Sequence, residues 1–194
     1  MKTKAFTVVL FLLFAGSIFA QETEKRFGFE LNGGPSRATA KIEGVNTQTG
    51  VGFEGLFHYR FMPHLGVYAG WGWNTLPAIH SFAGDDVCFE ETGYVFGLNF
   101  SHPIDGSGLS YYVRAAGLYN HIETENAGGD IINDTGHGLG FQLAGGIEIP
   151  LNSKWKLTPG VKFNSLSRET TYEGTTRELD YQYVSIRVGI ARKF

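Results

Sequence analysis

The chain has 194 residues and a formal net charge of −3, which suits one mildly acidic domain and, without any basic stripe, argues against a nucleic-acid partner. Its 27 glycines and 14% aromatic residues fit a β-rich fold better than a soluble enzyme. The only cysteine, Cys88, excludes an internal disulfide, and we expect an unreactive thiol in a loop or at a strand end.

Residues 1–20 have the pattern of a secretory signal peptide. Two lysines precede a mostly apolar run over 5–19, and Ala20 offers a small residue at the cleavage point before a polar stretch. The apolar run is shorter than the roughly 20 residues that a membrane-spanning helix needs. We therefore predict a cleaved signal peptide over 1–20, with cleavage at Ala20, and one exported domain over 21–194.

After the leader, apolar and polar residues alternate in segment after segment, which is the period of a β-strand rather than of a helix. The clearest case is 50–61, followed by a break at 62–64 and a second alternating segment that reads as its hairpin partner. Most segments have about the 9 to 11 residues that a tilted transmembrane strand requires. The predicted strands are 26–34, 50–61, 65–74, 91–101, 109–120, 137–149, 155–166 and 180–193.

The connections alternate between long and short, which places the long loops at one end of an up-and-down sheet and the short turns at the other. In bacterial outer-membrane barrels the short turns face the periplasm and the long loops face outside. Pro159 cannot donate to the strand ladder, so we expect a bulge there. The predicted long loops are 35–49, 75–90, 121–136 and 167–179, and the predicted short turns are 62–64, 102–108 and 150–154.

The residue types on the two faces indicate which face points outward. One face carries many large aromatic and aliphatic side chains, and eight strands enclose too little space to hold them. The opposite face is rich in glycine and alanine with interspersed polar groups, so we expect it to line the lumen. Charges there are costly unless paired, so we predict a lumenal ion-pair network. Its predicted members are Glu30, Glu54, Arg60, Glu91, Arg114, Glu148, Lys156, Lys162 and Arg187.

Aromatic residues also gather near the ends of the predicted strands, as in the two interfacial girdles of membrane barrels. The predicted periplasmic girdle contains Phe27, Tyr59, Phe61, Phe100, Tyr111, Trp155 and Phe194. The predicted outer girdle contains Trp71, Trp73 and Tyr119.

The last segment ends an alternating strand on a terminal aromatic residue. Arg187, Gly189 and Phe194 resemble the C-terminal assembly signal of outer-membrane barrels, although Arg192 stands where an apolar residue is usual. With the strand plan, the chain resembles the small eight-stranded outer-membrane barrels, such as the OmpA transmembrane domain, OmpX and the single-domain barrels of Bacteroidetes. The resemblance covers nearly all of 25–194 as architecture. We expect no periplasmic peptidoglycan-binding domain, so the tethering role of full-length OmpA-like proteins is not expected here.

This resemblance implies an all-β fold, an eight-stranded antiparallel up-and-down transmembrane β-barrel in the cell outer membrane. It also implies outer-membrane lipid and the barrel-assembly machinery as partners. We expect a plugged lumen, because wide aqueous pores take 16 to 18 strands. The role that fits is structural, or interaction and adhesion through the four long loops, with a surface ligand or a membrane protein as partner.

Three alternatives share parts of this pattern. A soluble, lipocalin-like calyx has the same alternation but needs its apolar face inward. A lipid-modifying barrel enzyme of the lipid A deacylase type needs a Ser and His pair, for which Ser101 and His102 are the nearest candidates. Glu54, Arg114 and Glu148 are also consistent with a catalytic or transport site, a hypothesis that we rank below a network of paired charges that fills the lumen. We expect no catalytic residue and no cofactor, and the six scattered histidines suggest no metal site.

Overall fold

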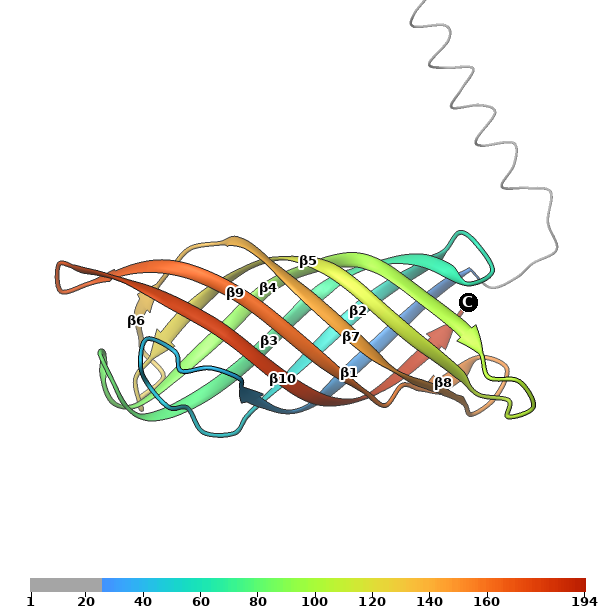
Figure 1. Ribbon diagram of the computed structural model, residues 1–194, viewed down its shortest axis with the longest axis horizontal. Helices are drawn as coiled ribbons and strands as arrows, with labels where there is room; N and C mark the ends of the chain where they lie inside the picture. Colours follow the sequence, from blue (N-terminus) through green and yellow to red (C-terminus); the bar gives the residue numbers. More distant parts are fainter. Residues whose placement is uncertain (1–25) are drawn as a thin grey trace, which may run out of the picture.

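The computed structural model describes residues 26–194, so the predicted signal peptide lies outside the described residues. These residues form one antiparallel sheet of ten strands that winds into the elongated shape of Figure 1. No helix in 26–194 is long and apolar enough to cross a membrane. The strands are β1 (Phe27–Ala38), β2 (Gly50–Arg60), β3 (Leu65–Ser81), β4 (Gly84–Pro103), β5 (Ser110–Glu125), β6 (Ile131–Asp134), β7 (Gly138–Pro150), β8 (Trp155–Leu157), β9 (Gly160–Tyr172) and β10 (Thr175–Lys193).

The sheet closes on itself through eight positions. Strands β1, β2, β3 and β4 each pair with the next strand in the chain. β5 then pairs with β7, β7 with β9 and β9 with β10, and β10 pairs with β1 to close the ring. The short strands β6 and β8 continue the positions of β7 and β9, because β6 also pairs with β5 and β8 also pairs with β7 and β10. The predicted all-β, antiparallel, up-and-down fold is confirmed, with two of its eight positions divided into two strands each.

Pro159 causes one of these divisions, but the expected bulge is wrong. β10 pairs Ile190 with Leu157 and Arg187 with Gly160, so the same number of residues separates the pairs on both strands. No extra residue is inserted. The ladder pauses for two residues at Thr158–Pro159, and the Pro159 carbonyl still accepts a hydrogen bond from Ile147 N at 3.0 Å. A proline that interrupts pairing without shifting register preserves the inward and outward alternation on both sides.

The predicted long loops are corrected by the structure, because most of their residues belong to strands. β3 runs to Ser81 and β4 starts at Gly84, while β9 runs to Tyr172 and β10 starts at Thr175. These two hairpins therefore turn within two residues and project at the end opposite the C-terminus (Figure 1). Within the predicted loop 121–136, residues 121–125 belong to β5 and 131–134 form β6, and only 39–49 remains largely irregular. These segments contain charged and turn-forming residues, so their sequence pattern did not indicate strands.

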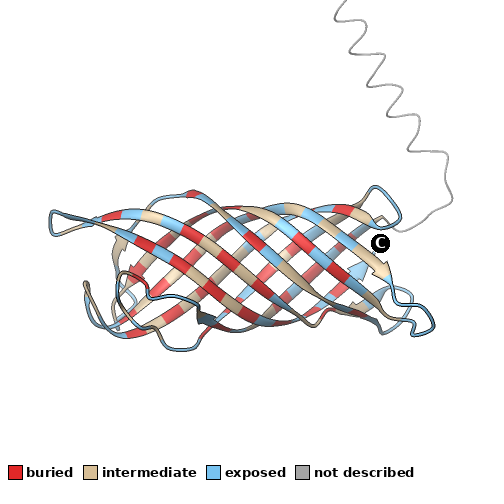
Figure 2. Ribbon diagram, viewed as in Figure 1, coloured by how far each residue is buried: buried red, intermediate tan, exposed pale blue. Residues whose placement is uncertain are grey.

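Exposed and buried residues alternate along the strands, as Figure 2 shows. Large apolar side chains such as Phe29, Phe96 and Leu139 lie on the outside, while Glu30 and Arg114 are buried inside. The predicted membrane-side-out arrangement is confirmed, and the apolar-inward calyx does not fit it. The start of β1 and the C-terminus lie at the end with the short turns, which is the periplasmic end of an outer-membrane barrel.

The polarity of the two faces of the sheet reverses near the end of the barrel opposite the short turns. On β4, Tyr94 and Phe96 point outward, but nearer the start of the same strand Phe89 and Val87 are buried inside and Glu90 takes an outward position. The outer surface thus changes from apolar to charged, and the interior from polar to apolar. This is the expected response to a change of surroundings from lipid to water, so this end extends beyond the membrane.

Candidate functional site

Three ion pairs join members of the predicted charge network inside the lumen, and their side chains are buried or largely buried. Arg114 donates from Nη2 to Glu30 Oε2 at 2.6 Å and from Nη1 to Oε1 at 3.1 Å, a two-pronged contact. Lys162 Nζ lies 2.6 Å from Glu54 Oε1, and Lys156 pairs with Glu148. The first two pairs join strands that are not neighbours in the ring, β1 with β5 and β2 with β9, so they connect opposite walls across the lumen. The third pair joins the neighbouring strands β7 and β8.

Glu54 receives a second hydrogen bond that extends its ion pair across the lumen. Gln142 Nε2 donates to Glu54 Oε1 at 2.7 Å, and Tyr68 Oη donates to Gln142 Oε1 at 3.0 Å. The Arg114 guanidinium also lies over the rings of Tyr68 and Tyr112. These contacts satisfy charged groups that would otherwise be costly to bury.

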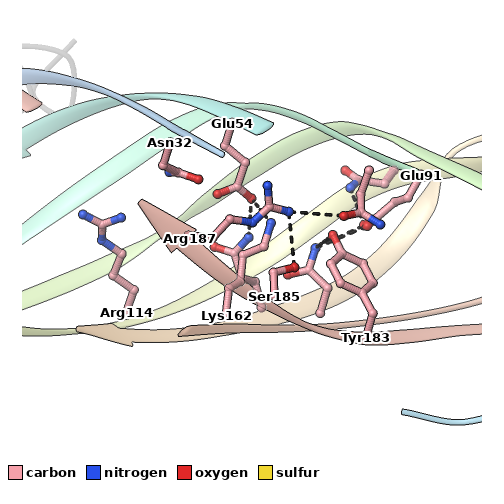
Figure 3. A network of polar contacts seen from close by, with 12 residues as sticks. Asn32, Glu54, Glu91, Arg114, Lys162, Tyr183, Ser185 and Arg187 are labelled. Atoms are coloured by element: carbon pink, nitrogen blue, oxygen red, sulfur yellow. Dashed lines mark hydrogen bonds and ion pairs between the residues drawn. The ribbon is translucent and has the colours of Figure 1, made fainter. Parts of the chain in front are cut away.

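Glu91 and Arg187 form hydrogen bonds with neutral side chains (Figure 3). Glu91 accepts from Asn120 Nδ2 at 2.7 Å and from Asn164 Nδ2 at 3.3 Å. Arg187 donates from Nη2 to Asn74 Oδ1 at 3.2 Å and to the Ser185 hydroxyl at 3.3 Å.

Arg60 lies apart from these residues, at the periplasmic mouth, where Nη1 donates to the Pro63 carbonyl at 3.4 Å. Apart from Arg60, the predicted lumenal set consists of four carboxylates and four cationic side chains, so its charges balance.

The space left in the polar part of the lumen is small. A cavity of about 100 Å³ opens at the periplasmic end beside Glu30 and Arg114. The next two cavities toward the outside each measure about 10 Å³, which is about the space that one water molecule needs. Side chains therefore fill most of the middle of the polar lumen, and the larger cavities lie at its periplasmic end.

A buried apolar cluster, which the sequence did not predict, lies inside the barrel beyond the polar network. Leu76, Phe89, Ile122 and Leu179 are completely buried inside the outer part of the barrel, and Ile42 from the irregular segment 39–49 packs with them. This apolar cluster also contains Ala78, Val87, Leu166, Tyr181 and Tyr183. Ion pairs thus occupy the lumen within the membrane-spanning part, and a buried apolar cluster occupies it beyond that part.

The residues predicted for the aromatic girdles lie at the two ends of the apolar outer surface. At the periplasmic end the ring centroids of Phe27 and Tyr59 are 4.9 Å apart, and those of Phe100 and Tyr111 are 6.1 Å apart. Phe61 and Trp155 are exposed at the same end. At the other end, Trp71, Trp73 and Tyr119 occupy outward positions on β3 and β5.

Tyr94 belongs with the outer aromatic residues, although the sequence analysis did not place it there. It is exposed on β4 and stands opposite Trp71 on β3 and Tyr119 on β5. Strand register, which the sequence does not reveal, was needed to find it.

The last strand places its predicted signal residues on different faces. Arg187 is buried in the lumen, and Gly189 also faces inward, where a Cβ would lie only 2.9 Å from Asn32 Cβ. Phe194 points outward, and its N–H donates to the Phe27 carbonyl at 2.9 Å. The atypical Arg192 lies over the Trp155 ring at 5.5 Å, which gives a charged residue a favourable aromatic contact.

Replacing Phe194 with Ala is expected to lower the amount of folded barrel in the outer membrane. The Phe194 ring contacts the Phe27 and Phe57 rings at 6.4 and 6.0 Å, and the substitution removes these contacts while it keeps the backbone hydrogen bond. Heat-modifiable migration of membrane fractions on a denaturing gel measures the folded amount. Phe61→Ala, which removes another exposed aromatic ring at the same end, is the control. Equal amounts for both variants would argue against a signal role.

The Ser and His pair considered for lipid chemistry does not form. Ser101 lines the periplasmic cavity, whereas the His102 ring packs against the exposed Phe100 and Tyr111 rings. Neighbouring residues on a strand point to opposite faces, so their side chains cannot share a proton. The structure instead stacks His102 on His64, with ring centroids 4.5 Å apart.

Comparison with known proteins agrees with this architecture. Neisserial surface protein A matches with a TM-score of 0.63 at 12% identity, covering 90% of this chain and all of its own. OprG from Pseudomonas aeruginosa matches with a TM-score of 0.54 at 15% identity, covering 88% of this chain and 97% of its own. Ail of Yersinia pestis, in complex with the heparin analogue sucrose octasulfate, has a TM-score of 0.51 at 12% identity and covers 87% and 99%.

At this identity the likeness to solved structures concerns the fold alone. No curated protein matches the sequence significantly. The model of the outer membrane protein beta-barrel domain matches residues 6–194, which is nearly the whole chain. Together with the closed ring, the apolar outer surface and the polar lumen, this match shows that the chain belongs to the outer membrane protein beta-barrel domain family and resides in the bacterial outer membrane.

Proposed function

We propose that this barrel is a closed membrane anchor whose acidic outer end binds a partner, a structural or adhesive role without catalysis. The observation that carries the proposal is the charge of that end. Segments 75–90 and 121–136 contain seven Asp or Glu residues and no Lys or Arg. Because β4, β5 and β6 supply all of these acidic residues except Asp130, the charges are held on paired strands with little conformational freedom to lose on binding.

The sign of the charge selects the chemistry of the partner. Ail was crystallised with a sulfated heparin analogue, which is a polyanion. The acidic outer end of this chain would repel such a ligand, and it would attract a basic protein surface. The surface partner that we propose is therefore a cationic protein segment. Outer-membrane lipid around the girdles and the barrel-assembly machinery acting on the last strand complete the proposed set of partners.

Binding of fluorescent poly-lysine to the full chain in detergent micelles tests this proposal. We expect saturable binding that weakens as salt increases, because exposed charges are screened, and no binding of sucrose octasulfate. Removing two charges at the tip of the β3–β4 hairpin, with Asp85→Asn and Asp86→Asn, should weaken binding. Asp105→Asn removes an exposed charge from the periplasmic turn and is the control. Equal weakening by the control, or a preference for the polyanion, would contradict the proposal.

A further inference from the structure

A group of metal-ligating side chains lies on the outer surface directly beyond the outer aromatic residues. Along β5 the outward positions after Tyr119 are His121, Glu123 and Glu125. Strand pairing sets Asp134 of β6 opposite Glu123, and Glu90 of β4 on the other side of the same residue. Regular pairing, rather than a mobile loop, therefore brings these groups together.

The distances within this group suit a single ion. His121 Nδ1 lies 2.9 Å from Asp134 Oδ1 and 3.8 Å from Glu123 Oε1. One potential ligand atom from each of the three residues falls within 4.8 Å of the others. The His137 ring stacks on the His121 ring with centroids 4.4 Å apart, which restricts the orientation of the imidazole.

A second set of carboxylates adjoins the first through Glu123. Ligand atoms of Glu90, Glu123 and Glu125 also lie within 4.8 Å of one another. Trp73 Nε1 donates to Glu90 Oε2 at 2.6 Å and holds that carboxylate in place.

The charge of the group is not balanced by the chain. Within residues 26–194 no Lys or Arg forms an ion pair with Glu90, Glu123, Glu125 or Asp134. The His121 and Glu123 side chains are only 14% and 18% exposed, so water screens them incompletely. In the lumen, by contrast, Glu30, Glu54 and Glu148 each have a cationic partner. A divalent cation would supply the same compensation on the outer surface.

We propose that His121, Glu123 and Asp134 bind a divalent transition-metal ion such as Zn²⁺. One imidazole nitrogen and two carboxylate oxygens are a ligand set that Zn²⁺ accepts, and three protein ligands leave a position open toward the surroundings. Glu90 and Glu125 lie outside this set and add negative charge. The position beside Tyr119 places the ion at the level of the lipid headgroups. Glu123 and Asp134 also belong to the acidic outer end on which the proposed interaction role rests. Asp85 and Asp86, which test that role, lie outside the metal site, so the two proposals can fail separately.

Calorimetric titration of the full chain in detergent micelles with Zn²⁺ tests the site, with Mg²⁺ as the comparison ion. We expect saturable binding of one Zn²⁺ per chain and no comparable binding of Mg²⁺. Asp134→Asn and Glu123→Gln preserve side-chain shape and should each weaken Zn²⁺ binding about tenfold or more. Replacing Zn²⁺ with Co²⁺ should give an absorption spectrum that these substitutions abolish.

His80→Ala is the matched control, because His80 Nδ1 also contacts a carboxylate, Asp85, at 2.7 Å at the same end of the barrel. That pair is largely exposed and has no third ligand in the described residues. Its loss should leave Zn²⁺ binding unchanged. Heat-modifiable migration on a denaturing gel checks that each variant is folded. Because Asp134 is exposed, Asp134→Asn is the substitution expected to disturb the barrel least. Unchanged binding in Asp134→Asn and Glu123→Gln, or loss of binding in His80→Ala, would overturn the proposal.

Discussion

Replacing Lys162 with Met is expected to destabilise the barrel by about 3–5 kcal/mol, because it leaves the buried Glu54 carboxylate without its cation. Lys162 Nζ and Glu54 Oε1 are 2.6 Å apart, and both side chains are almost completely buried. The Gln142 hydrogen bond to the same oxygen remains, but a neutral amide replaces little of the lost attraction. Urea unfolding in lipid vesicles, followed by tryptophan fluorescence, measures the loss.

A second substitution separates the loss of the ion pair from the loss of packing. Glu54→Gln in the Lys162→Met background removes the unpaired charge while it keeps an acceptor for Gln142, so it should restore most of the stability. Glu43→Gln breaks the more exposed Arg177–Glu43 pair and should cost at most about 1 kcal/mol. A similar cost for Lys162→Met and Glu43→Gln would show that the lumenal pair is hydrated and of little consequence.

Replacing Phe89 with Ala is expected to cost about 3–5 kcal/mol, the usual range for removing a buried aromatic ring. Phe89 is completely buried in the apolar cluster of the outer end, where its carbonyl also accepts a hydrogen bond from Tyr181 Oη. The neighbours belong to paired strands and cannot move far to fill the cavity. The same urea titration measures the effect, and planar-bilayer recordings show whether the cavity lets ions pass.

Phe96→Ala is the matched control on the same strand. Phe96 is 51% exposed and faces the lipid region of the outer surface, so its loss should affect stability much less than the loss of Phe89. The comparison tests the reversal of faces along β4 directly. Equal losses in the free energy of unfolding for the two substitutions would contradict the assignment of Phe89 to the apolar interior and of Phe96 to the lipid-facing surface.

The sequence revealed the fold best where one face of each strand meets lipid and the other a narrow lumen. In 50–61 the contrast between Phe53 or Phe57 and Glu54 is strong, and the predicted strand nearly coincides with β2. The signal faded where the surroundings change to water. Pro77, Asp85 and Asp86 are typical of loops, yet they lie on strands whose inward residues are apolar.

The sites that depend on register were largely beyond sequence reasoning. Alternation predicted that the lumenal charges share one face, but not that Glu30 would contact Arg114 rather than Lys156. His121 and Asp134 lie too far apart in sequence to suggest a shared site, and the β5–β6 turn brings them together. Pro159 was noticed, but only the register on both sides shows that no residue is inserted.

The seam between β1 and β10 differs from every other junction in the ring. All other adjoining positions are joined by a local turn or hairpin, whereas the seam pairs Gly28 with Lys193 across almost the entire described chain. Local hairpins can zip up as soon as their residues are available, but contacts of such long sequence separation form slowly. Until the seam closes, two strand edges carry backbone N–H and C=O groups that hydrocarbon cannot solvate. Ring closure is therefore the step that makes this chain compatible with a bilayer, and it requires the outermost residues of both end strands.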